Sequence, residues 1–129
     1  MSPVFLTLDE ILTLHEIQLS RFGGLSGLRD TGLLESALAM PQAGFGEHYA
    51  HEDIFAMAAA YLFHLVKNHP FADGNKRVGF HAAYVFLQMN GHILTMSQDA
   101  AYDLVIATAE GRIDKGGIAQ AFRDGSRAL

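Results

Sequence analysis

The stretch HPFADGNKR, from His69 to Arg77, brings together side-chain types that can carry out phosphoryl-transfer chemistry. A histidine can take a proton from an attacking hydroxyl group near neutral pH. An aspartate beside bound phosphates can hold Mg²⁺, which binds one or two carboxylates together with phosphate oxygens. Adjacent cations that follow a glycine can bind the phosphates themselves. We therefore interpret this stretch as the candidate site for transfer of a phosphate-containing group.

The position of Lys76 and Arg77 is unfavourable for stability alone. The preceding Asp-Gly-Asn sequence is typical of a helix start, so both cations are expected in or next to the first turn. That turn already carries the positive end of the helix dipole, and each cation there costs roughly 0.3–1 kcal/mol. Between residues 30 and 110 the only other basic residue is Lys67. A bound polyphosphate would resolve this conflict, with Gly74 allowing close approach of the backbone.

Each of these residues also has a purely structural interpretation. Asp73 or Asn75 can act as an N-cap. His69 can be a turn residue bonded to a backbone carbonyl, and Lys76 and Arg77 can be solvated surface. Taken together, these interpretations leave the clustered cations unexplained. The stretch does not match the P-loop pattern G-x-x-x-x-G-K-[ST].

A histidine pair elsewhere in the chain, His48 and His51, is a weaker candidate for a zinc site. The acidic residues near it are Glu47, Glu52 and Asp53. The sequence shows no complete set of four ligands there. His64 lies within an apolar segment and is interpreted as a packed, hydrogen-bonded core residue.

Length and composition indicate a single globular domain spanning residues 1–129. The chain is 50% hydrophobic and only 18% charged, which excludes a disordered protein. Its formal net charge of −5 argues against direct nucleic-acid binding, and it has no cysteine. The N-terminus lacks the pattern of a signal peptide, and the longest apolar block, 54–66, is too short to span a membrane. We expect a cytoplasmic protein without a membrane segment.

Helical periodicity and capping signals predict an all-α fold of about six helices that position this stretch. In chain order, the predicted helices run from the capping box at Thr7–Glu10 to Gly23, from Asp30 to Met40, from Glu52 to Asn68, from Asn75 to Met89, from Ser97 to about Glu110, and from after Gly116-Gly117 toward Leu129. The segment 41–51 is predicted to be a loop or a short hairpin. Residues 92–96 are interpreted as a connector.

The motif HPFADGNKR resembles the signature of the Fic/Doc superfamily, whose Fic branch has the pattern H-P-F-x-[DE]-G-N-G-R-x-x-R. Lys76 stands where Fic enzymes have glycine, and Phe80 stands where they have the second arginine. Both differences resemble the Doc branch. The segments LSRFGGLSGLRDTGLLESAL and FLQMNG are also similar to Doc toxins, so the resemblance covers nearly the whole chain.

The resemblance implies a compact helical Fic fold in which the motif loop runs into a helix. It also implies a toxin that transfers the γ-phosphoryl group of ATP to a threonine of elongation factor Tu, with Mg²⁺, and thereby inhibits translation. His69 would activate the target hydroxyl, Asp73 would hold Mg²⁺, and Phe71 would anchor the loop. The phosphate-binding residues would be Gly74, Asn75, Lys76 and Arg77. A flap beside the site would position the target, and its candidate residues are Phe45, Gly46, His48 and Tyr49.

Two alternatives remain open within the same family. Transfer of AMP, as in Fic enzymes, is favoured by Pro70 and Gly74 and opposed by Lys76 and Phe80. An inactive module that only binds an antitoxin is opposed by the intact motif.

The resemblance also implies silencing by a separate Phd-like antitoxin that binds as a helix in a groove. Many Fic proteins instead carry an inhibitory [ST]-x-x-x-E-[GN] helix of their own. The nearest match here, Glu110-Gly111, has Ile106 at the Ser/Thr position, so no internal inhibitor is evident.

Overall fold

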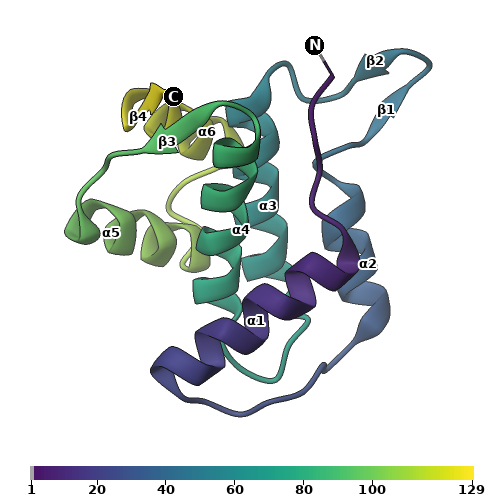
Figure 1. Cartoon of the computed structure of the whole chain (residues 1–129), viewed down its shortest axis with the longest axis vertical. Coiled ribbons are helices and arrows are strands. Elements are labelled where there is room, and N and C mark those ends of the chain that lie inside the picture. Colours follow the sequence, from purple (N-terminus) through teal and green to yellow (C-terminus); the bar gives the residue numbers. More distant parts are fainter. Residues whose placement is uncertain (1) are drawn as a thin grey trace.

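The structure is a computed structural model that describes residues 2–129. Among these residues it contains six helices and two short antiparallel strand pairs (Figure 1). The helices are α1 (Leu8–Phe22), α2 (Thr31–Ala39), α3 (Ile54–Asn68), α4 (Asn75–Met89), α5 (Gln98–Ala109) and α6 (Lys115–Asp124). The strand pairs are β1 (Gly44–Phe45) with β2 (His48–Tyr49), and β3 (His92–Leu94) with β4 (Ser126–Ala128). The predicted all-α fold with a hairpin in the 41–51 segment is confirmed.

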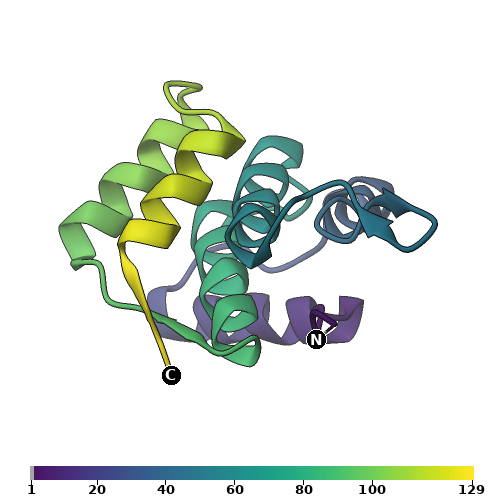
Figure 2. The same cartoon turned by 90° about the horizontal axis from the view of Figure 1, so that it is seen from above.

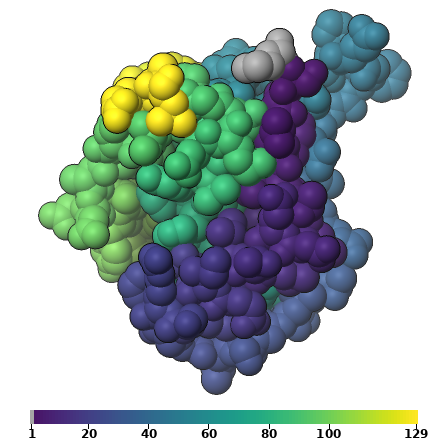
Figure 3. All heavy atoms as spheres, viewed as in Figure 1, coloured from purple at the N-terminus to yellow at the C-terminus, as the bar shows by residue number. Residues whose placement is uncertain are grey.

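The centre of the molecule is α3, which packs against α2, α4 and α6 (Figures 1 and 2). Its buried residues lie on every side of the helix, as expected for a core helix rather than a surface helix. Within residues 2–129, no helix is both long and apolar enough to cross a membrane. In the space-filling view, the purple N-terminal segment adjoins the green α4–β3 region on one face, and the β1–β2 hairpin projects from the body (Figure 3).

Five of the six helices begin at a side chain that accepts a hydrogen bond from a backbone N–H of the first turn. These capping residues are Thr7, Asp30, Asp53, Ser97 and Asp114. The predicted caps at Thr7, Asp30 and Ser97 are therefore confirmed. Two predicted starts were wrong by a few residues: α3 begins after Asp53, and α6 begins before Gly116-Gly117 because Asp114 caps it.

The C-terminal region differs from the prediction. Residues 92–94, interpreted as a connector, form β3, and residues 126–128 form β4 rather than a fraying helix. Each strand has three residues, which is too short for an alternating pattern to be visible in the sequence. The pairing depends instead on the close approach of two segments that are far apart along the chain.

Candidate active site

The motif loop, residues 69–74, connects α3 to α4 and is held by the preceding segment 23–30. His69 ends α3 in the left-handed conformation, with φ 51° and ψ 54°, and is the one non-glycine residue with positive φ among residues 2–129. Such a conformation costs on the order of 1–3 kcal/mol, so neighbouring groups must hold it. The Arg29 side chain does so: its Nε donates to the His69 carbonyl at 2.7 Å, and its Nη2 donates to the Asn68 carbonyl at 3.0 Å.

Buried side chains fix the same loop from inside. Asn75 is 4% exposed; its Oδ1 accepts from the Phe71 N–H at 2.9 Å, and its Nδ2 donates to the Phe71 carbonyl at 3.0 Å. The Phe71 ring, 1% exposed, stacks on the His15 imidazole with 3.8 Å between ring centroids. His15 Nε2 lies 2.8 Å from the Asp73 carbonyl oxygen, to which it donates. Asn75 therefore clamps the loop and is not the N-cap of α4.

The start of α4 differs from the other helix starts because no side chain caps it. Its N-cap is Gly74, with φ 78° and ψ 15°. Lys76 and Arg77 lie exposed in the first turn, where there is no acidic residue. The unpaired N–H groups, the helix dipole and two cations thus make one positively charged region. Of all ligands, an anion fits such a region best.

Asp73 is an exposed carboxylate beside this region, held by backbone N–H groups. Its Oδ2 accepts from the Leu25 N–H at 3.1 Å, and its Oδ1 accepts from the Gly74 N–H at 2.9 Å. These two bonds, and then the charge of Arg77, lower the pKa of Asp73 below its ordinary value. A Cβ on Gly24 would lie 2.7 Å from Oδ2, so only glycine lets this segment approach so closely. The carboxylate is thus ionised at neutral pH, and it does not cap α4.

The donor set at Asp73 fits Mg²⁺ only together with phosphate. Among the residues that the structure describes, no three His, Cys, Asp or Glu side chains come together as a metal site. The zinc alternative at His48 and His51 therefore finds no ligand set. Mg²⁺ is commonly held by one or two carboxylates, water and substrate phosphates. Asp73 can supply the carboxylate, and a nucleotide bound at the start of α4 would supply the phosphate oxygens.

The imidazole of His69 lies at the rim of the same site. The side chain is exposed, and within residues 2–129 no protein group forms a hydrogen bond with its ring. The structure therefore does not show the alternative, in which the His69 ring donates a hydrogen bond to a backbone carbonyl. Both ring nitrogens are available to substrate, as a general base requires.

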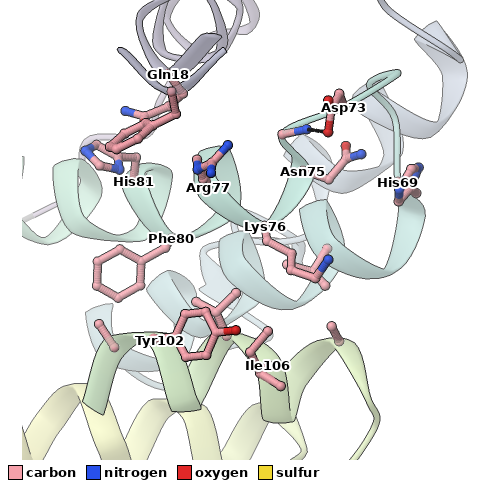
Figure 4. A pocket seen from close by; sticks show the side chains of 16 residues that line it. Gln18, His69, Asp73, Asn75, Lys76, Arg77, Phe80, His81, Tyr102 and Ile106 are labelled. Carbon is pink, nitrogen blue, oxygen red and sulfur yellow. Dashed lines mark hydrogen bonds between the residues drawn. The ribbon is translucent and has the colours of Figure 1, made fainter. Parts of the chain in front are cut away.

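A pocket of about 600 Å³ contains the motif residues and extends along α4 (Figure 4). From right to left in Figure 4 lie His69, Asp73 and Asn75, then Arg77, then Gln18 and His81. The walls come from α4, from the C-terminal half of α1, and from α5, which supplies Tyr102 and Ile106. This volume is in the range of small-molecule sites. The pocket is therefore large enough for a ligand that occupies both the charged start of α4 and the region beyond Arg77.

The end of the pocket farther from His69 contains a polar side chain without a partner. Gln18 is 2% exposed, and neither its amide nitrogen nor its amide oxygen has a hydrogen-bond partner among residues 2–129. An unpaired buried polar group costs roughly 1–3 kcal/mol. His81, also in this region, is half-buried, and burial followed by the charge of Arg21 lowers its pKa. The polar Gln18 thus lies where packing alone would favour an apolar residue.

Sequence reasoning did not identify His15, Gln18 or Arg29 as site residues. A partial signal existed for two of them, because His15 and Gln18 lie four and seven residues after Ile11. These spacings place all three on one helix face, and all three are buried. Polar residues on an otherwise apolar face indicate a structural or functional role. For Arg29, no local pattern carries such a signal.

The hairpin residues Phe45, Gly46, His48 and Tyr49 lie away from the pocket, and none of them lines it. The hairpin precedes the N-terminus of α3, whereas His69 follows its C-terminus (Figure 1). The hairpin therefore does not lie beside the pocket, where the resemblance implied a flap. The segment next to the motif is 23–30, whose Leu28 forms a β-bridge with Phe71. Phe45 does not cover the core, since it is 92% exposed.

His64 is a hydrogen-bonded residue of the α3–α6 interface, as the sequence indicated. Its Nε2 lies 3.1 Å from Lys115 Nζ, which donates to it. Burial, and then the positive charge of Lys115, lowers the pKa of His64 to about 4. His64 is therefore neutral at physiological pH and lies outside the pocket.

Comparison with known proteins places these features in a broader context. The model of the Fic/DOC family matches residues 5–87. The chain is 35% identical over 118 residues to "Protein kinase doc" of Escherichia phage P1, covering 89% of this chain and 90% of that protein. It is 39% identical over 114 residues to "Toxin Doc" of Mycolicibacterium smegmatis, covering 85% of each. The matched region of the family includes α1, the segment 23–30 and the whole motif loop.

Proposed function

The chain belongs to the Fic/DOC family, and on that premise we propose that it is a Doc-like toxin that transfers the γ-phosphoryl group of ATP to a protein hydroxyl. The observation that carries the proposal is the uncapped, positively charged start of α4, in one pocket with an exposed histidine and an ionised carboxylate. Few arrangements other than a phosphate-binding site account for the two cations there. The proposed target is a threonine of elongation factor Tu, whose modification would inhibit translation.

In the proposed reaction, the hydroxyl oxygen of the target attacks the γ-phosphorus while His69 takes the proton from that hydroxyl. The bond between the γ-phosphorus and the bridging oxygen breaks, and ADP leaves. The first-turn N–H groups, Lys76 and Arg77 hold the phosphates and stabilise the charge that develops on them. Asp73 would hold Mg²⁺, which neutralises phosphate charge when bound. Arg29 and Asn75 act indirectly, by fixing the loop that carries His69.

A second candidate is AMP transfer, in which the target oxygen attacks the α-phosphorus and pyrophosphate leaves. Gly74 and Pro70 favour it because they match the Fic pattern. Phe80 disfavours it, since a half-buried aromatic side chain that packs on Phe122 occupies the position of the second Fic arginine. The positive charge that Fic enzymes have at this position is therefore absent here.

We propose a Phd-like antitoxin as the partner that silences the protein. The name of the Mycolicibacterium smegmatis relative, "Toxin Doc", supports a toxin–antitoxin pair, and the phage P1 relative is also a Doc protein. Exposed apolar side chains surround the site at Phe22, Leu25 and Leu28, which are 58%, 70% and 38% exposed. Such a surface is suited to the apolar face of an amphipathic helix. The segment 23–30, rather than the β1–β2 hairpin, is also the proposed contact for the target protein.

The test is to incubate the purified protein with ATP, Mg²⁺ and elongation factor Tu and to record the intact mass of the factor. A phosphoryl increment supports the kinase proposal, and an adenylyl increment supports AMP transfer. The matched control is the His69→Ala variant, which should leave the mass unchanged. An unmodified factor, with a preparation that a known Doc kinase does modify, would contradict this choice of target.

A further inference from the structure

The buried amide of Gln18 is not needed for the chemistry at His69, yet it lies in the same pocket. Packing does not account for it, because neither of its polar atoms has a hydrogen-bond partner in the part of the chain that the structure describes. The aromatic side chains that line the pocket are Phe22, Phe80 and Tyr102, and Phe80 lies on the Gln18 side of Arg77 (Figure 4). A ligand that enters here would therefore meet aromatic side chains, the imidazole of His81 and the unpaired donor and acceptor of the Gln18 amide.

A carboxamide presents one donor and one acceptor side by side. Adenine offers the complementary pair in its exocyclic amine and an adjacent ring nitrogen, which is why glutamine pairs with adenine in two-bond contacts. Guanine presents two acceptors at the corresponding edge and is the partner of arginine or lysine instead. Aromatic side chains add stacking that any base can use. Through the base edge that carries N7, the Gln18 amide thus fits adenine better than guanine.

The position of Gln18 also suits the rest of a nucleotide. Arg77 lies between the Asp73 side of the pocket and the Gln18 side (Figure 4). From Asn75 to His81 the pocket follows α4 for six residues, or about 9 Å along the helix axis. A nucleoside polyphosphate can span this separation, with its terminal phosphate near His69 and its base beyond Arg77. Arg77 itself is fixed over the Phe22 ring, with Cζ 4.7 Å from the ring centroid.

We propose that Gln18 recognises the base of the nucleotide and selects adenine over guanine. This inference rests on the proposed function, since it assumes that the start of α4 holds the phosphates. It adds a specificity-determining residue that lies outside the motif and on a different helix. The unpaired amide is then a recognition group whose hydrogen bonds form only when the base is present.

The test is calorimetric titration of the full-length protein, in Mg²⁺, with ADP, GDP and tripolyphosphate. Wild-type protein should bind ADP roughly 10- to 100-fold more tightly than GDP, the range expected for one two-bond contact. Gln18→Leu should reduce ADP affinity to about the GDP level and leave tripolyphosphate binding unchanged. The matched control, Gln88→Leu, replaces an exposed glutamine of α4 outside the pocket and should behave as wild type.

Base analogues on the wild-type protein test the same contact without a mutation. The diphosphate of purine riboside lacks the exocyclic amine and should bind about 10-fold more weakly than ADP. Unchanged affinity for this analogue, or equal binding of ADP and GDP, would overturn the role of Gln18 and leave the proposed function standing. Failure to bind both ADP and tripolyphosphate would overturn the proposed function as well.

Discussion

The starts of α1 and α4 differ in almost every feature that stabilises a helix, although both helices have 15 residues. At α1, Thr7 Oγ1 accepts from the Glu10 N–H at 3.2 Å, and Glu10 Oε1 accepts from the Thr7 N–H at 2.9 Å. At α4, the N-cap is Gly74, no side chain caps the helix, and the first turn has cations in place of acids. The first start satisfies its own N–H groups, and the second leaves them available to a ligand.

The comparison shows where the stability of the motif comes from. A side-chain cap contributes about 1 kcal/mol, and favourable first-turn charges contribute some tenths more. The start of α4 lacks both contributions. The loop before it is held instead by Asn75, by the stack of Phe71 on His15, and by Arg29. Because these contacts hold the loop without using the first-turn N–H groups or the His69 ring, those groups remain accessible to substrate.

The largest predicted effect separates chemistry from stability at the start of α4. His69→Ala should lower the rate of group transfer by roughly 10²- to 10⁴-fold, because the general base is lost. The melting temperature should hardly change, because the side chain is exposed and unpaired. Mass spectrometry of the target and a thermal melt measure the two quantities. A fully active variant would show that another group takes the proton.

The second prediction makes the start of α4 resemble that of α1. Lys76→Glu places an acid in the first turn, so the free energy of unfolding should rise by about 1 kcal/mol as the charge–dipole interaction becomes favourable. Nucleotide affinity should fall roughly 10- to 100-fold, since a phosphate contact becomes repulsive. Urea unfolding and calorimetric titration measure these opposite changes.

The control for this change is Lys67→Glu, which alters the net charge equally but lies in the last turn of α3. There the lysine is favourably placed, so the variant should be slightly less stable and should bind nucleotide as wild type does. If Lys76→Glu lost stability, or kept its nucleotide affinity, the comparison between the two helix starts would not hold.

The third prediction concerns α1 alone. Thr7→Ala removes the capping box and should lower the free energy of unfolding by about 1 kcal/mol. The activity of the folded protein should be unchanged, because Thr7 does not line the pocket. Urea unfolding and the mass assay together give both values. A loss of activity in fully folded protein would indicate that the start of α1 positions His15 and, through it, the motif loop.

The smallest effect is expected on the free energy of unfolding at acid pH, and it comes from the ionisation of Asp73. Hydrogen bonds from Leu25 and Gly74 hold the pKa of Asp73 below its ordinary value, so the ionised carboxylate stabilises the folded state. That contribution is fully present above the unfolded pKa of about 3.9 and is lost as pH falls through the lower folded pKa. The stability difference between wild type and Asp73→Asn should therefore be constant from about pH 5 to 7 and shrink below about pH 4.

Urea unfolding of the protein without nucleotide, at a series of pH values, checks this prediction. Asp99→Asn is a suitable control, because Asp99 is an exposed acid in the first turn of α5, outside the pocket. A difference between wild type and Asp73→Asn that stays the same at low pH would mean that the charge of Asp73 does not matter for stability.

The sequence by itself determined the features that depend on a few consecutive residues. The capping box at Thr7–Glu10 and the caps at Asp30 and Ser97 were visible because a cap bonds to an N–H group three residues away. The cations at the start of α4 followed from the position of the preceding glycine. The same local pattern carried the family resemblance, which the comparisons confirm.

Only the tertiary structure decided which distant residues meet the motif. His15 and Asp73 are 58 positions apart, and Arg29 and His69 are 40 positions apart, yet both pairs form hydrogen bonds. The pairing of β3 with β4, the place of the β1–β2 hairpin and the burial of Gln18 likewise depend on how helices pack. Local propensity cannot specify such contacts, because their free energy arises only when segments far apart in the chain are brought together by a shared core.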